Sequence, residues 1–269
     1  MILAINTTTL HFSLALLEDN GNVRGEFSMT EKQGHFGSLM PALQFLFEQT
    51  RTTRRQIGCL AVATGPGSFT GLRVGLSAAK GLCHGIGVPL IGISSLKALA
   101  SQTAHSHLPV AAVLDSRRDE LFTARFKWDE TRALVRMTED ASIKLENFPS
   151  MFNQNTLFLG NDYARQGHLI KDLLGEKACL SPAHLWNLMA SSIGSLALLR
   201  YQAQDFDDPH GLDPKYLRPP DIRPNPYDPG KEMTGRDLRS GRFPEAPHGK
   251  ASCLSPKCHD QARGQGEAG

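Results

Sequence analysis

Residues 63–75 read Ala63-Thr64-Gly65-Pro66-Gly67-Ser68-Phe69-Thr70-Gly71-Leu72-Arg73-Val74-Gly75, and this stretch decides the fold. It follows the apolar run 59–63, which predicts a buried strand, and it opens a helix predicted over residues 69–85. Glycines permit a close approach of backbone N–H groups, and a helix N-terminus favours anions. Gly65, Gly67 and Ser68 are therefore candidate phosphate-binding residues. Because no Gly-Lys-Ser/Thr follows, the stretch is not a Walker A loop, and a plain tight turn is the competing interpretation.

The predicted helix 69–85 carries an unusual number of small residues. Gly71, Gly75, Ala78 and Gly85 share one face, and Gly81 is a further break. Each glycine costs about 1 kcal/mol relative to alanine inside a helix, so the face needs a close neighbour. That neighbour is either a second helix, in this chain or across a subunit interface, or the chain's own sheet.

The chain around this stretch alternates short apolar strands with helices. Asn20-Gly21 between two apolar runs predicts a hairpin, and Ser94 is predicted to cap the helix that follows it. In order, the first half gives strands 2–5, 12–17 and 23–28, helix 38–49, strand 59–63, helix 69–85, strand 89–93 and a helix from residue 95.

The second half repeats the opening meander about 108 residues later. It gives strands 110–114, 120–126, 133–138 and 156–159 and a helix after Asn161. A final helix is predicted over 181–203, with Ser181 as its cap and Pro182 in the first turn. Its predicted apolar face consists of Leu185, Leu188, Met189, Ile193 and Leu196.

Two related βββαβα units predict an α/β fold of the actin-like ATPase, ribonuclease H-like type. The predicted parts are an N-terminal lobe over 1–105, a smaller lobe over 106–223 and a disordered tail over 224–269. In such folds the turns after the first strand of each lobe meet across a nucleotide cleft. Here these turns are residues 6–9 and 115–118, which adds Asp115 to the candidate phosphate residues. The cleft is expected to be degenerate.

The tail differs in composition from the rest of the chain. Of the 46 residues from 224 to 269, 13 are Pro or Gly and 11 are apolar, too few to offset the entropy of ordering. Cys253, Cys258 and His259, with His248 upstream, contain metal-binding groups, but their spacing fits no compact zinc finger. Incidental cysteines in an unstructured tail are the preferred interpretation.

Charge and composition argue against several classes of protein. The 269 residues carry 29 Lys and Arg against 27 Asp and Glu, a formal net charge of +2, so no basic field for nucleic acid is expected. Five scattered cysteines, no signal-type N-terminus and no long apolar run predict a reduced, cytoplasmic protein without membrane contact.

Several motifs together resemble the TsaB (YeaZ) family over about residues 1–218. The block from Gly65 to Gly75 is the most specific of them. The others are Ile2-Leu3-Ala4-Ile5-Asn6-Thr7, Gly34-His35-Phe36-Gly37-Ser38-Leu39-Met40-Pro41, Ser94-Ser95-Leu96, Asp115-Ser116-Arg117-Arg118 and Tyr216-Leu217-Arg218. The resemblance implies a non-catalytic partner of TsaD, which with the ATPase TsaE makes threonylcarbamoyladenosine beside the anticodon of ANN-decoding tRNAs.

The resemblance also implies which surface binds TsaD. In the family, helices corresponding to 38–49 and 69–85 pack against their counterparts in TsaD. The predicted interface residues are Leu39, Leu43, Phe69, Leu72, Arg73, Gly75, Leu76 and Ala79. On this hypothesis Gly75→Leu abolishes the complex and leaves the fold intact. Homodimer and heterodimer are the open alternatives for this chain, and tRNA is expected to bind mainly through the complex.

No catalytic or metal-binding residue is predicted in this chain, and ATP and metal are expected in the partner subunits. His105 and His107 are two residues apart, so they do not share a helical face as the paired histidines of TsaD do. Asn6 replaces the Asp usual in the family, and an amide is a poor magnesium ligand. The alternatives are an actin-like ATPase or sugar kinase that uses Gly65–Ser68 and Asp115, and a peptidase, for which no nucleophile constellation stands out.

Overall fold

The computed structural model describes residues 1–30, 37–103, 105–116 and 119–218. The predicted tail 224–269, with its cysteines and histidines, lies outside the described residues. So do Gly34, His35 and Phe36 and the pair Arg117 and Arg118 of the motifs quoted above.

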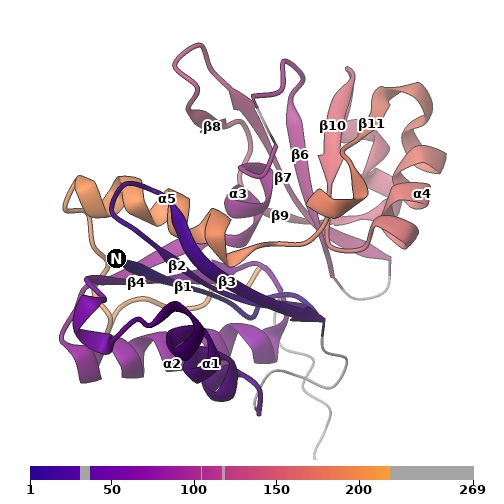
Figure 1. Cartoon of the computed structure of the whole chain (residues 1–269). Helices are drawn as coiled ribbons and strands as arrows, with labels where there is room; N and C mark the ends of the chain where they lie inside the picture. Colours follow the sequence, from indigo (N-terminus) through magenta and orange to yellow (C-terminus); the bar gives the residue numbers. More distant parts are fainter. Residues whose placement is uncertain (31–36, 104, 117–118, 219–269) are drawn as a thin grey trace, which may run out of the picture. The chain divides into compact units, whose positions relative to one another are not determined.

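The first sheet contains five strands in the order β3-β2-β1-β4-β5 (Figure 1). They are β1 (Ile2–Asn6), β2 (His11–Leu17), β3 (Val23–Thr30), β4 (Cys59–Gly65) and β5 (Leu90–Ser94). The pairs β1–β2 and β2–β3 are antiparallel, whereas β1–β4 and β4–β5 are parallel. The predicted hairpin turns at Gly21, whose φ is +88°.

Both faces of this sheet are buried, which explains its continuous apolar runs. Leu3 and Ile5 point towards helices α1 (Leu39–Thr50) and α2 (Phe69–Ile86). Ile2 and Ala4 point to the opposite face, where helix α5 (Ala190–Gln202) packs (Figure 1). Strand alternation therefore divides one apolar run between two helical layers.

The second sheet repeats the strand order of the first, as β11-β10-β6-β7-β8, with β9 also paired to β7. Its strands are β6 (Val110–Asp115), β7 (Glu120–Trp128), β8 (Leu134–Arg136), β9 (Ala141–Lys144), β10 (Thr156–Leu159) and β11 (Ala178–Leu180). The pairing directions also repeat: β6–β7 is antiparallel, and β6–β10 and β10–β11 are parallel. This duplication confirms the predicted α/β, actin-like fold class.

The second unit departs from a strict βββαβα order. In the place that α1 takes in the first unit, two 3-10 turns, Leu145–Asn147 and Pro149–Met151, connect β9 to β10. The rings of Phe148, Phe152 and Phe158 pack together at this point. Helix α4 (Tyr163–Leu174) then follows β10 as predicted, and Asp162 caps it by accepting from the backbone N–H of Arg165.

The prediction of one helix over 181–203 is wrong. A 3-10 turn spans Ala183–Leu185, the chain is extended at Met189, and α5 begins only at Ala190. The interruption is stabilised by the Gln102 side chain, which donates to the carbonyl oxygens of Leu185 and Asn187 and accepts from the N–H of Met189. Ser181 caps no helix, because its backbone N–H donates to Phe158 of β10 and its buried hydroxyl has no partner.

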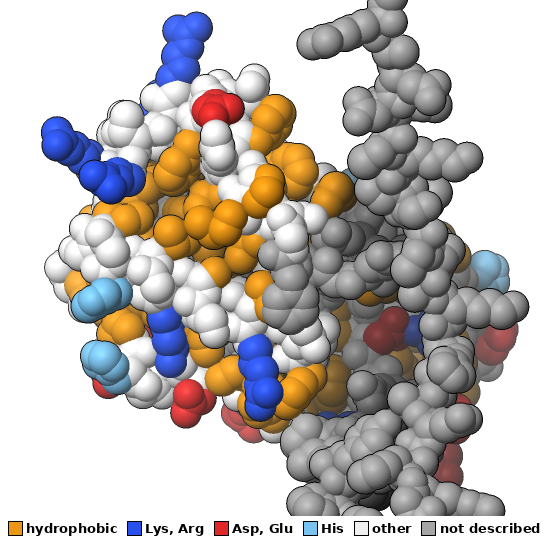
Figure 2. All heavy atoms as spheres, turned by 90° about the horizontal axis from the view of Figure 1, so that it is seen from below, with side chains coloured by type: hydrophobic (Ala, Val, Ile, Leu, Met, Phe, Trp, Pro, Cys, Tyr) orange, Lys and Arg blue, Asp and Glu red, His pale blue; other side chains and the backbone are white. Residues whose placement is uncertain are grey.

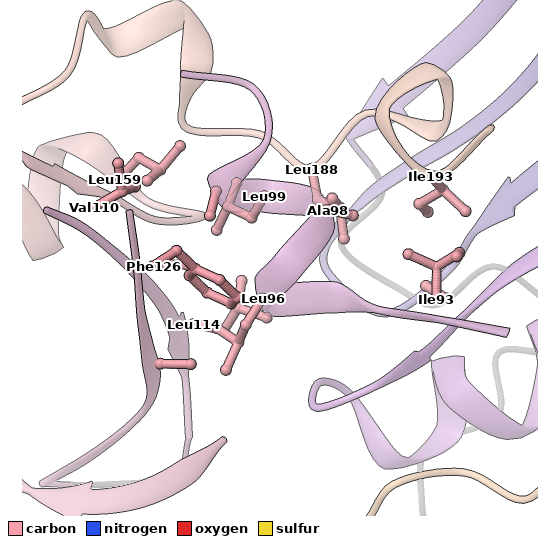
Figure 3. Packing of buried hydrophobic residues seen from close by; sticks show 14 of the residues in the cluster. Ile93, Leu96, Ala98, Leu99, Val110, Leu114, Phe126, Leu159, Leu188 and Ile193 are labelled. Atoms are coloured by element: carbon pink, nitrogen blue, oxygen red, sulfur yellow. The ribbon is translucent and has the colours of Figure 1, made fainter. Parts of the chain in front are cut away.

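A shared apolar core joins the two sheets through the short helix α3 (Ser95–Ala100). Figure 3 shows Leu96 and Leu99 of α3 beside Leu114 and Phe126 of the second sheet. The predicted cap is confirmed, since the Ser94 hydroxyl accepts from the N–H of Lys97. The lobe boundaries at residues 105 and 223 stay a prediction.

A C-terminal strap, residues 205–218, runs along the outer strand β5 of the first sheet. The N–H of Asp207 donates to the carbonyl of Leu90, and its carboxylate accepts from the N–H of Gly92 and from Arg200. Farther on, the N–H of Lys215 donates to the carbonyl of Thr64, 2.7 Å away. The strap thus covers a strand edge that would otherwise offer unpaired backbone groups.

Within the described ranges, none of the helices combines the length and the apolar character needed to cross a bilayer.

Candidate functional site

The candidate phosphate turn is filled by the chain itself. A Cβ at Gly67 would overlap the Thr8 carbonyl, to which the N–H of Ser68 donates at 2.7 Å. The Ser68 hydroxyl caps α2 by accepting from the N–H of Gly71. Gly65, with φ +111°, faces the Lys215 carbonyl of the strap instead. This geometry favours the tight-turn interpretation, and phosphate binding stays a prediction.

A small cleft nevertheless brings Ser68 and Asp115 together. A cavity of about 240 Å³ lies between the turn after β1, the start of α2 and the end of β6. A neighbouring cavity of about 290 Å³ shares part of this lining and reaches His11. The residues that line both cavities are Leu10, Asp115 and Asn161. Thr8 and Thr9 of the first predicted turn and Asp115 of the second therefore line the same cavity.

Asn6 and Asp115, at the ends of β1 and β6 beside the cleft, are both hydrogen-bonded within the chain. The Asn6 amide donates to the carbonyl oxygens of His11 and Leu188, at 3.0 and 2.8 Å, and its oxygen accepts from Thr8. Asp115 accepts from Arg165, from Gln166 at 2.7 Å and from Asn161. A carboxylate held by a guanidinium and two amides has few lone pairs left for a metal ion.

The described residues contain no group of three His, Cys, Asp or Glu side chains able to hold a metal ion. The thiols of Cys59 and Cys83 are buried within the first unit, and burial raises the pKa of Cys59 to about 12. The His105 ring packs edge-on against Trp128, with 4.8 Å between ring centroids.

The glycine face of α2 has its close neighbour within the chain. A Cβ at Gly71 would meet the Thr7 carbonyl, and one at Gly75 would meet the Thr7 hydroxyl, which donates to the carbonyl of Gly71 at 2.7 Å. The expectation that Gly75→Leu leaves the fold intact is therefore corrected: the larger side chain overlaps the turn after β1. Gly81 and Gly85, in contrast, have nothing within 4 Å of an added Cβ.

Most of the predicted interface residues belong to the interior. Leu39, Leu43, Leu76 and Ala79 are buried in the core between α1, α2 and the sheet, and Leu72 is also buried. These five side chains, together with Gly75, lie on the buried inner sides of the two helices. Of the predicted set, only Phe69 and Arg73 have side chains that reach the surface, half-buried and exposed respectively.

A second apolar stripe on the same helices faces outward, and the sequence analysis missed it. Met40 is 54% exposed, and four other side chains are half-buried. We call this set the α1–α2 face: Met40 and Phe47 of α1 and Val74, Ala78 and Leu82 of α2. Figure 2 views the molecule from this side and shows apolar side chains gathered into a patch. The available signal was that both helices are apolar on two sides, which one sheet cannot bury.

The patch is hollowed rather than flat. A groove of about 570 Å³ runs along α1 and is lined by Met40, Pro41, Leu43, Gln44, Phe47, Glu48 and Thr52. A second groove, of about 560 Å³, lies between α2 and the strap. Exposed apolar patches with grooves are typical of protein-binding surfaces.

Comparison with known proteins identifies the family. The model of the family "TsaD: tRNA N6-adenosine threonylcarbamoyltransferase" matches residues 27–192. The tRNA threonylcarbamoyladenosine biosynthesis protein TsaB of Bacillus subtilis is 30% identical over 220 residues, which cover 81% of this chain and 93% of that protein. The chain belongs to the TsaB (YeaZ) family.

Other TsaB relatives agree. Escherichia coli TsaB is 36% identical over 131 residues, 48% of this chain and 56% of that protein. The structure of YeaZ from Pseudomonas aeruginosa superposes with a TM-score of 0.67 at 21% identity, covering 80% of this chain and 99% of that one, and shows the same fold. TsaB proteins take part in tRNA threonylcarbamoyladenosine biosynthesis, and this is the pathway of the family.

Proposed function

We propose that this TsaB-family chain is a non-catalytic scaffold subunit. It binds a TsaD-like catalytic subunit through the α1–α2 face and thereby enables threonylcarbamoyl transfer to the adenosine beside the anticodon of ANN-decoding tRNAs. A TsaE-like ATPase completes the system, and the chain acts in the cytoplasm. It holds no cofactor of its own, and ATP and metal belong to the partner subunits.

The observation that carries the proposal is the α1–α2 face. Two helices whose inner sides already fill the core keep a second apolar side towards solvent. Burial of apolar surface contributes roughly 25 cal/mol per Å², so a complementary pair of helices gains by covering it. The family model that matches this chain describes a TsaD transferase, and the TsaB relative is a protein of tRNA threonylcarbamoyladenosine biosynthesis. Both observations support a TsaD-like protein as the partner.

The cleft supports a role without catalysis. The ATPase alternative needs free carboxylates for magnesium, whereas Asn6 is an amide and Asp115 is paired with Arg165. The near-balanced charge of the chain fits tRNA binding by the assembled complex rather than by this subunit alone.

Size-exclusion chromatography with a purified TsaD-like subunit tests the proposal. The wild-type chain co-elutes with that subunit, and Met40→Asp shifts the pair to two separate peaks because a charge enters the apolar contact. Leu199→Asp is the matched control, since Leu199 is 65% exposed on α5, on the other face of the sheet. If the free chain self-associates and Met40→Asp removes this self-association, the chain forms a homodimer through this face.

A reconstituted tRNA modification reaction tests the consequence. With TsaD-like and TsaE-like subunits, ATP and an ANN-decoding tRNA, modification requires the wild-type chain and is lost with Met40→Asp. Full modification without this chain, or ATP turnover by this chain alone, contradicts the scaffold role.

A further inference from the structure

Arg73 is held in place by two aromatic side chains on the groove between α2 and the strap. Its guanidinium carbon lies 4.0 Å from the centroid of the Phe69 ring, and its Nε donates to the Tyr216 hydroxyl at 2.9 Å. The rings of Phe69 and Tyr216 are 5.0 Å apart. Within the described chain, the two terminal nitrogens of Arg73 meet no acceptor.

This arrangement prepares the arginine for a bidentate partner. A guanidinium presents its paired N–H groups in a planar fork that matches a carboxylate. Holding the fork in advance reduces the side-chain entropy lost on binding. Phe69 covers one face of the Arg73 guanidinium, and Tyr216 accepts only from Nε. The two terminal nitrogens of Arg73 therefore remain available at the exposed surface.

The surrounding groove adds a second cation. Lys80 lies two turns farther along α2, is half-buried, and has no carboxylate within salt-bridge distance among the described residues. The complete lining is Arg73, Leu76, Ser77, Lys80, Asp213, Pro214 and Tyr216. Asp213 is the one acidic member of this lining, so the groove carries a net positive charge.

We propose that this groove receives a carboxylate side chain of the TsaD-like partner, held by the Arg73 fork and attracted by Lys80. The inference rests on the proposed function and extends its surface from the α1–α2 face to the strap. The occupant is a protein rather than the phosphate backbone of RNA for two reasons. The groove contains Asp213, and it adjoins α2 residues of the apolar face, a contact that a nucleic acid does not need.

The strap thus contributes a residue to the partner surface. Tyr216 is 143 positions from Arg73 in the chain. The backbone hydrogen bond from the N–H of Lys215 to the carbonyl of Thr64 fixes the strap next to Tyr216, so that Tyr216 lies against α2. The strap orients the arginine, and the arginine contacts the partner.

Binding measurements with the intact chain and a TsaD-like subunit test this inference. Arg73→Gln weakens the affinity about 30-fold or more, as expected for loss of a charge pair at a protein interface. Arg73→Lys keeps the charge, loses the fork and weakens it by about tenfold. Arg55→Gln, a change at an exposed arginine on the 3-10 turn after α1, leaves the affinity as in the wild type. Tyr216→Phe removes only the hydroxyl that positions Nε and gives an intermediate loss.

The charge reversal Arg73→Glu identifies the partner group. It abolishes binding, and replacement of one acidic residue of the partner by arginine restores it. Circular dichroism and thermal unfolding show each variant folded, because Arg73 is at the surface.

Three outcomes separate this inference from the proposed function. If the wild type itself does not bind the TsaD-like subunit, the proposed function fails. If Met40→Asp abolishes binding and Arg73→Gln leaves it unchanged, the proposed function stands and the carboxylate groove is overturned. If Arg73→Gln lowers only the affinity of the free chain for tRNA, the occupant is a phosphate and the inference is likewise overturned.

Discussion

The Nζ of Lys215 lies 3.0 Å from Oδ2 of Asp140, a carboxylate whose side chain is entirely buried. Lys215 belongs to the strap and Asp140 to the loop before β9 of the second sheet. Arg136 also pairs with Asp140, and the Ser94 hydroxyl at the end of β5 contacts both. This cluster of two cations and one carboxylate links the strap, the first sheet and the second sheet.

Asp140→Ala is expected to lower the free energy of unfolding by about 3 kcal/mol, because Arg136 and Lys215 lose their shared partner in a partly buried position. Urea denaturation at neutral pH measures it. Lys144→Met is the control: its ammonium pairs with Glu146 at the surface, and its loss changes stability by less than about 0.5 kcal/mol. Equal effects of the two substitutions would show that the buried cluster adds nothing.

Two glycines on α2 are expected to respond in opposite directions to the same change. Gly75→Ala lowers stability by about 2 kcal/mol, since the new methyl group overlaps the Thr7 hydroxyl. Gly81→Ala raises it by about 0.5–1 kcal/mol, because the site is open and alanine favours the helix. Thermal unfolding of both variants gives the comparison, and stabilisation by Gly75→Ala would refute the packing against Thr7.

Asn6→Asp replaces the amide by a carboxylate, and we expect it to destabilise this chain by about 3 kcal/mol. A carboxylate cannot donate, so the carbonyl oxygens of His11 and Leu188 lose the hydrogen bonds that Asn6 donates and face a negative charge. Asn147→Asp, at an exposed position, is the matched control. Denaturant midpoints measure both, and an unchanged midpoint for Asn6→Asp is the contrary result.

His11 makes stability depend on pH. Burial lowers the pKa of His11 below its ordinary 6.5. The unfolded chain therefore binds this proton at a higher pH than the folded chain does, and stability falls as the pH drops below about 6.5. His11→Gln reduces the slope of the urea midpoint between pH 7.5 and 5.5. His210→Gln, at an exposed position, keeps the wild-type slope, and so would His11→Gln if burial of the ring were without effect.

Local signals in the sequence predicted much of the fold. Ser94 caps the helix it precedes, and the repeated pattern of strands corresponds to two sheets with the same strand order. The late start of α5 was missed because the Gln102 side chain, from a distant segment, satisfies the backbone of residues 185–189. A propensity argument sees only neighbours in the chain.

The candidate site was predicted less well for the same reason. A stripe of glycines indicates that something approaches closely, but the sequence does not say that the approaching group is Thr7 of the same chain. Most of the residues predicted for the interface are apolar positions of α1 and α2, and such positions are usually buried in the core. The Arg73–Tyr216 contact joins residues 143 positions apart, so no local pattern could indicate it.

The path of the strap has a consequence for the order in which the molecule is made. Strands β1 to β5 are synthesised within the first 94 residues. However, one face of their sheet is covered only by α5, and its outer edge only by residues 205–218, which are synthesised later. During translation the nascent sheet therefore exposes apolar side chains and unpaired backbone groups until the second unit has also been made. A molecular chaperone that shields this incomplete sheet on the ribosome would raise the yield of folded protein. Once the strap has paired with the sheet, this shielding is no longer needed.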